Sequence, residues 1–260
     1  MRLALGIYIV ACIPSMAGPA SAKPPSPAKP IGPVAIAYPA ALRNELDHLP
    51  RVVPNQAVTA AVATKINAAL QREDARGNAA AAECRQSFQE MQHKTPKDAW
   101  TRSIAVTMAG PHYLGIVVRD SNYCGGAYPN DGMRSDFVYD LTTGRPVDWV
   151  KLFPAGAKGK LENSADGAVT GLVAWPGLTE RAKAQADGDC RDVFDEDEYS
   201  GFSIGLDAQR GALVAEPAEL PHVIQACADD IRLSVADLRK LGFAPELVAA
   251  LDAASRYPRR

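Results

Sequence analysis

The sequence has few of the residue patterns on which common metal and nucleotide sites depend. It contains four histidines, and no two of them are spaced as i, i+3 or i+4, so we expect no metal site carried by one helix. It has no C-x-x-C pair, no G-x-x-x-x-G-K-[ST] phosphate loop and no D-x-D-x-D-G calcium loop. We therefore expect neither a metal nor a cofactor, and we interpret the acidic residues at 192–198 as a solvated loop.

An excess of basic charge is also missing. The chain has 28 Lys and Arg residues against 30 Asp and Glu residues, which gives a formal net charge of −2. Domains that bind nucleic acid normally carry a basic patch, so we expect no nucleic-acid partner.

No apolar run reaches the roughly 20 residues that a membrane-spanning helix needs. The nearest candidate, residues 3–11, follows Arg2 and precedes an A-x-A site that ends at Ala22. This pattern predicts a signal peptide over residues 1–22, cleaved after Ala22, with export across the inner membrane to the periplasm and no transmembrane span. Residues 9–12 also fit a lipoprotein cleavage site, in which Cys12 would carry the lipid.

The signal is followed by a proline-dense stretch, residues 23–34. Proline at this density favours an extended, solvated chain, so we interpret the stretch as a tether. We expect the remaining chain to divide into a mainly helical segment at 35–100 and a sheet-containing domain at 101–254.

Four cysteines remain after the signal. An even number in an exported chain predicts a disulfide framework. Of the three pairings that four cysteines allow, we favour the sequential one, because it closes two local loops of about 40 residues, each contributing roughly 4 kcal/mol. Free buried thiols are the alternative. The predicted bonds join Cys84 to Cys124 and Cys190 to Cys227.

The apolar periodicity predicts helices first and strands later. Val58, Val62, Ile66 and Leu70 recur at helical spacing, with Asn55 as the expected N-cap. Gly77 and Asn78 are expected to end this helix, and a second helix is predicted over 79–92. Strands are expected near 104–108, 113–118 and 136–141, followed by a hairpin at 202–215 and short helices. We predict an α+β fold with a mainly antiparallel sheet packed against helices and two disulfides.

Several of these segments together are similar to a known family. Residues 123–130 (YCGGAYPN), 137–147 (FVYDLTTGRPV) and 152–153 resemble the core motif of the domain of unknown function family 3298, which includes RsiV-like ectodomains. Residues 49–70 resemble the domain of unknown function family 4163, which commonly precedes it. Members are exported or anchored on the outer face of bacteria, so the resemblance implies a cell-envelope interaction module. The motif commonly has His where this chain has Tyr128, and no role of an imidazole is carried over.

The candidate binding loop lies inside this motif. It comprises Gly125, Gly126, Tyr128 and Asn130. Paired glycines could present backbone N–H groups to an anion or a peptide, and a strand bulge beside a disulfide is the alternative.

We predict a non-catalytic binding module for a cell-wall component or an envelope protein, and we single out no catalytic residue. The alternative is a cell-wall glycan hydrolase that uses a carboxylate pair, and a purely structural stability factor is the third hypothesis. A pocket with two close carboxyls of shifted pKa would favour the enzyme, and an exposed aromatic patch over the sheet would favour binding.

Overall fold

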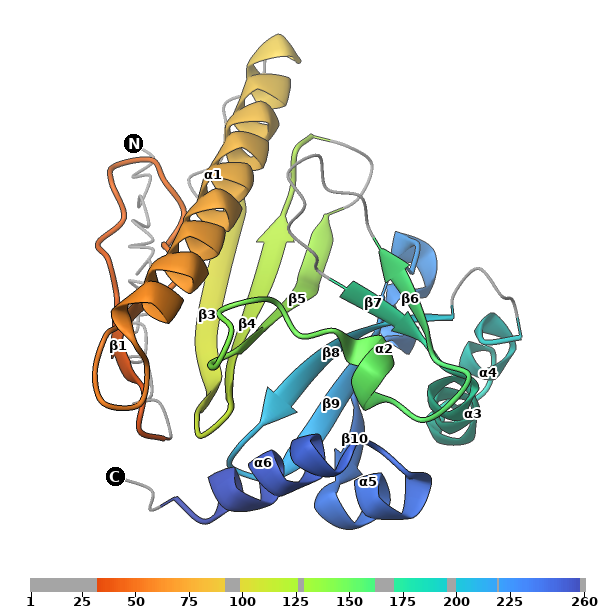
Figure 1. Cartoon of the computed structure of the whole chain (residues 1–260). Coiled ribbons are helices and arrows are strands. Elements are labelled where there is room, and N and C mark those ends of the chain that lie inside the picture. The colour runs from red at the N-terminus through yellow and green to blue at the C-terminus, as the bar shows by residue number, and fades with distance from the viewer. Residues whose placement is uncertain are drawn as a thin grey trace, which may run out of the picture.

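The computed structural model describes residues 32–91, 99–125, 129–161, 171–195, 200–218 and 220–257. The predicted signal peptide and most of the proline-rich tether lie outside these ranges, and so does Cys12. Figure 1 shows a long helix, α1, lying across a three-stranded sheet, with a second sheet and the C-terminal helices beside them. The predicted α+β class is confirmed: all strand pairs in the described residues are antiparallel.

The N-terminal part is a small hairpin held against helix α1. Strand β1 (Ala35–Ala37) pairs with β2 (Arg51–Val53), and α1 spans Ala60–Glu90. The side-chain amide of Asn67 on α1 acts as a strand neighbour, because it bonds both the N–H and the C=O of Val52, at 2.8 and 2.9 Å. The hairpin therefore depends on the helix for its position.

Two expectations about α1 were wrong. The N-cap is Thr59, whose hydroxyl accepts from the Val62 N–H, whereas the Asn55 side chain caps the preceding turn. The helix also continues through Gly77 and Asn78. A Cβ atom on Gly77 would lie 2.5 Å from Nη2 of Arg102, so glycine here lets the helix approach the sheet closely.

The first sheet has the order β3-β4-β5 and packs its apolar face against α1. Its strands are β3 (Trp100–Ala109), β4 (Tyr113–Asn122) and β5 (Asn130–Asp140). Strand β5 begins six residues before the predicted 136–141 segment. Its additional residues are mostly polar, and Arg134 among them forms hydrogen bonds with Glu216 and Asp230 beside the second sheet.

The second sheet has the order β10-β9-β8-β7-β6. Its strands are β6 (Lys158–Leu161), β7 (Gly171–Ala174), β8 (Gly201–Asp207), β9 (Ala212–Pro217) and β10 (Ile231–Ser234). The predicted hairpin at 202–215 is confirmed as β8 and β9. Short helices surround this sheet: α2 (Trp149–Leu152), α3 (Pro176–Gln185), α4 (Cys190–Val193), the 3-10 helix η2 (His222–Cys227), α5 (Val235–Leu241) and α6 (Pro245–Ser255).

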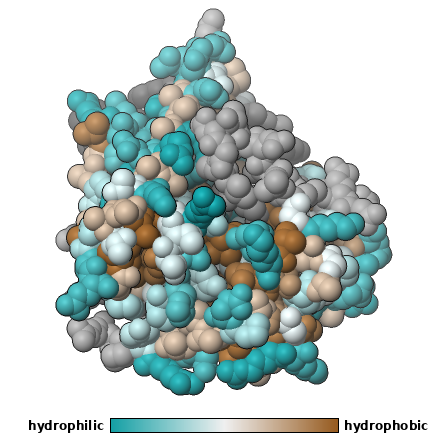
Figure 2. Space-filling model, in the orientation of Figure 1, coloured by the Kyte–Doolittle hydropathy of each residue, from teal (hydrophilic) through white to brown (hydrophobic). Residues whose placement is uncertain are grey.

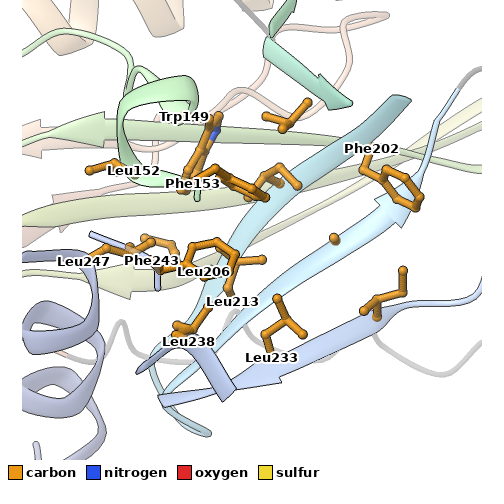
Figure 3. Close-up of a cluster of buried hydrophobic side chains, with 14 of the residues drawn as sticks. Trp149, Leu152, Phe153, Phe202, Leu206, Leu213, Leu233, Leu238, Phe243 and Leu247 are labelled. Carbon is orange, nitrogen blue, oxygen red and sulfur yellow. The ribbon is translucent and has the colours of Figure 1, made fainter. Parts of the chain in front are cut away.

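The larger core lies between the second sheet and these helices. Figure 3 shows Trp149 of the short helix α2, Phe153 directly after that helix, and Phe243, near the C-terminal helices, pointing toward leucines of β8, β9 and β10. Phe153 and Phe243 pack with their ring centroids 4.7 Å apart. This core fixes β8 and β9, the strands that reach across to the first sheet.

Both predicted disulfides are present in the sequential pairing. Cys84 at the end of α1 is bonded to Cys124 after β4, with an S–S distance of 2.04 Å. Cys190 in α4 is bonded to Cys227 in η2, with an S–S distance of 2.00 Å.

Candidate functional site

The predicted binding loop falls in the sequence between β4 and β5, and Gly125 and Asn130 are its residues that the structure describes. Gly125 has a φ of +87°, and a Cβ atom there would lie 1.8 Å from Cε of Met91, so the backbone packs directly on the helix. Asn130 begins β5, and its side-chain amide donates to Oδ1 of Asn122 at 3.3 Å. Gly126 and Tyr128 lie outside the described residues. The structure thus anchors the described ends of this loop.

A pocket of about 310 Å³ opens beside Asn130, where β5 meets the second sheet. We call it the junction pocket. Its polar wall contains Arg134, Ser203 and Glu216, and its apolar wall contains Met133 and Leu220 together with neighbouring residues (Leu172, Pro217 and Ala218). Of the predicted loop, Asn130 is the described residue that the structure brings into this pocket.

A buried ion-pair network forms the floor of the junction pocket. Arg134 and Asp136 alternate on one strand, so their side chains share a face of β5. Nε of Arg134 donates to Oδ2 of Asp136 at 2.7 Å, and Nη2 donates to Oδ1 at 3.0 Å. The two side chains are 7% and 1% exposed. This bidentate geometry gives the strongest kind of arginine–carboxylate contact.

The same guanidinium reaches the second sheet. Nη1 of Arg134 donates to Asp230 at 2.9 Å and to Glu216 at 3.4 Å. Arg119 on β4 donates to the same oxygen of Glu216 at 2.9 Å. The two sheets therefore meet through charges in this region as well as through apolar contacts.

The carboxyl group of Glu216, in the wall of the junction pocket, has a raised pKa. Burial raises the pKa of Glu216 to about 7, although the guanidinium of Arg119 acts in the opposite direction, and a hydrogen bond with Asp230 raises the pKa further. Near neutral pH a substantial fraction of Glu216 is therefore protonated. Glycosidases hold their two carboxyl groups about 5–5.5 or 6.5–9.5 Å apart, with the sugar between them. Hydrogen-bonded carboxyls leave no such space.

Residues 201–205 fit the pattern G-x-S-x-G, a signal that the sequence-based interpretation missed. In serine hydrolases this pattern forms a sharp turn between a strand and a helix, which exposes the serine. Here it lies inside strand β8, Ser203 is buried, and its hydroxyl donates to Oδ2 of Asp136 at 2.9 Å. That carboxylate is already bound by Arg134, so the arrangement does not activate a nucleophile.

Three tyrosines on or beside the strands of the first sheet bear on the aromatic patch that would favour binding. Tyr113 and Tyr139 are buried in the cores, and Tyr123 is 39% exposed and packs on Phe88 with the ring centroids 5.6 Å apart. On the face in Figure 2, apolar residues appear between hydrophilic ones. In the described ranges no group of three His, Cys, Asp or Glu side chains is placed to hold a metal, and no helix is both long and apolar enough to cross a bilayer.

No family model and no curated protein matches the sequence. Among solved structures, the chain is similar to a member of the domain of unknown function family 3298 from Bacteroides fragilis, with a TM-score of 0.50 and 12% identity over 86% of this chain and 100% of that one. A second protein of that family, from Pseudomonas aeruginosa, gives a TM-score of 0.41 and 14% identity over 84% of this chain and 97% of that one. The predicted resemblance is thus confirmed at the level of the fold by the first of these structures. The likeness of residues 49–70 to family 4163 stays a prediction.

Proposed function

We propose that the protein is an exported, non-catalytic binding module of the bacterial envelope, a member of the domain of unknown function family 3298, and that it holds its ligand in the junction pocket. The observation that carries this proposal is the network under the pocket. Arg134 and Glu216 reach the pocket wall while their buried partners hold them in fixed positions. Small-molecule sites typically combine an apolar lining with a few such preorganised polar groups.

The proposed location rests on the signal-peptide pattern and on the disulfides. Structural disulfides persist in oxidising compartments such as the periplasm. Both predicted pairs have bonding geometry in the fold. Export by a cleaved signal is the proposal, with lipidation at Cys12 as its alternative.

The chemistry of the pocket points to a ligand rich in amide and hydroxyl groups. Asn130 and Ser135 offer side-chain hydrogen bonds, and the raised pKa of Glu216 lets that carboxyl act as a donor when protonated and as an acceptor when ionised. Met133 and Leu220 provide apolar contact. An N-acetylated glycan or a stem peptide of the cell wall has this combination of groups.

Binding to soluble peptidoglycan fragments tests the proposal. We expect saturable binding by isothermal titration calorimetry, weakened at least about fivefold by Met133→Ala, because this residue lines the pocket without belonging to the ion-pair network. Val150→Ala is the matched control, since Val150 is 43% exposed on α2 and Met133 is 37% exposed. Absence of binding, or equal weakening by both variants, would overturn the assignment of this pocket.

One observation favours the hydrolase alternative, namely the raised pKa of Glu216, since perturbed carboxyls concentrate at catalytic sites. The hydrogen bond between Glu216 and Asp230 argues against the hydrolase, because it leaves no space for a sugar between the two carboxyl groups. Incubation of the purified protein with peptidoglycan decides between the two. Release of reducing ends that is lost in Glu216→Gln would establish the enzyme, and unchanged glycan is the outcome expected here.

A further inference from the structure

A second cavity, separate from the junction pocket, lies between helix α1 and the turn that follows β5. Its volume is about 350 Å³, within the range of small-molecule sites. We call it the basic cleft. Three cationic side chains line it: Lys65 and Arg72 from α1, and Arg145 from the turn. Lys65 and Arg72 are seven residues apart, two helical turns, so they lie on the same side of α1.

The turn that carries Arg145 is fixed in place. Oδ1 of Asp140 accepts the N–H groups of Thr142 and Thr143, at 2.6 and 2.9 Å, and the Arg145 carbonyl accepts the Asp140 N–H at 2.9 Å. Gly144, with a φ of +71°, presses the turn onto α1, because a Cβ atom there would lie 3.0 Å from the Val62 carbonyl oxygen. The cations thus converge from two rigid elements.

The positive charge of the cleft is not neutralised within the described part of the chain. None of the three cations forms an ion pair with a described residue, and Nζ of Lys65 makes one long contact, 3.5 Å, to the Thr143 carbonyl. Glu73 is the acidic residue of the lining, but its carboxylate is bound to Arg76. Burial raises the pKa of Glu73, although the nearby guanidinium groups of Arg76 and Arg72 act in the opposite direction, which makes this carboxyl easier to protonate than an exposed one.

The inner wall of the cleft is largely apolar and aromatic. Val138 and Tyr139 are buried, and Phe137 is half-buried beside them. Rings and aliphatic surfaces favour the apolar faces of a sugar, and guanidinium forks favour planar or tetrahedral oxyanions. The two features lie within one cavity.

We propose that the basic cleft binds a small saccharide that carries an oxyanion, a phosphate ester or a carboxylate. Arg145 and Arg72 bind the oxyanion from opposite sides, Lys65 adds a third charge, and the aromatic wall contacts the ring. This site is distinct from the junction pocket, so it stands or falls independently of the function proposed above.

The test titrates the full secreted chain, by NMR or calorimetry at low salt, with glucose 6-phosphate, glucuronate and neutral glucose. We expect saturable binding of at least one of the anionic sugars and none of glucose. The phosphate and carboxylate arms identify which oxyanion is preferred. Arg145→Gln is expected to weaken binding about tenfold, the usual scale for losing one charge-assisted contact.

Arg191→Gln is the matched control, because Arg191 is an exposed arginine on α4 in the other half of the molecule. It should change the affinity less than about twofold, and unfolding curves should show all variants folded, since the substituted arginines are exposed. The proposal is overturned if neither anionic sugar binds, if both substitutions weaken binding equally, or if inorganic phosphate binds as tightly as the sugars.

Discussion

The carboxylate of Asp136 occupies the space in which a side chain at position 205 would stand, because a Cβ atom built on Gly205 would lie 2.1 Å from its Oδ1. Gly205 is in the middle of the buried strand β8, where glycine is normally unfavourable. The close approach of a buried ion pair from the neighbouring sheet explains it.

We therefore expect Gly205→Ala to destabilise the protein by about 3 kcal/mol, because the methyl group must displace a carboxylate that Arg134 holds in place. Urea unfolding measures the change. Gly159→Ala on strand β6 is the control, since its Cβ atom would meet only the Val150 side chain, at 3.2 Å. Similar losses for the two variants would contradict this explanation of Gly205.

The two arginines that contact Glu216 should differ in their effect on stability. Arg134→Met removes the partner of a carboxylate that is 1% exposed, which should cost about 3–5 kcal/mol. Arg119→Met removes a side chain that is 42% exposed and should cost less than about 1 kcal/mol. Adding Asp136→Asn to Arg134→Met should restore part of the loss, because the orphaned charge disappears. Equal unfolding free energies for the two single variants would show that the buried contacts of Arg134 stabilise the protein no more than the exposed contact of Arg119.

Glu216 should make the protein less stable as the pH rises. Its pKa is raised from 4.5 to about 7 in the folded state, so the folded protein binds the proton more tightly than the unfolded chain. The contribution of this group is complete below pH 4.5 and is lost as the pH rises through 7, by about 3 kcal/mol in all.

Unfolding of the wild type and Glu216→Gln between pH 4.5 and 8 isolates that contribution, because other titrating groups cancel in the difference. The unfolding free energy of the wild type minus that of Glu216→Gln should fall as the pH rises and become constant above about pH 7. Glu83→Gln, at an exposed position on α1, should leave the profile unchanged. If the unfolding free energies of the wild type and Glu216→Gln changed in parallel with pH, the pKa of Glu216 would not be raised in the folded protein.

The periodicity of apolar residues along the sequence predicted the parts of the fold that are determined by neighbouring residues. The stripe from Val58 to Leu70 predicted the first turns of α1, and the hairpin β8–β9 followed from alternation around a glycine turn. The break expected at Gly77 was wrong because the helical penalty of glycine, about 1 kcal/mol, is offset where it lets Arg102 approach.

The junction pocket could not be predicted in the same way. Arg134 and its partners Glu216 and Asp230 are 82 and 96 residues apart in the sequence, so no spacing reveals their contact. The polar start of β5 looked like loop, because a strand that meets its neighbour through ion pairs lacks the apolar alternation used to recognise strands. Among the described residues of the predicted binding loop, Asn130 lies at the end of the first sheet where the junction pocket opens.

Neither disulfide bond joins one sheet to the other. The bond at Cys84 closes on the first sheet, and the bond at Cys190 closes among the helices around the second. Oxidation thus constrains each half separately, while the boundary between them is held by ion pairs and by apolar side chains of the first sheet, such as Met108 and Val138, that share one core with the second sheet.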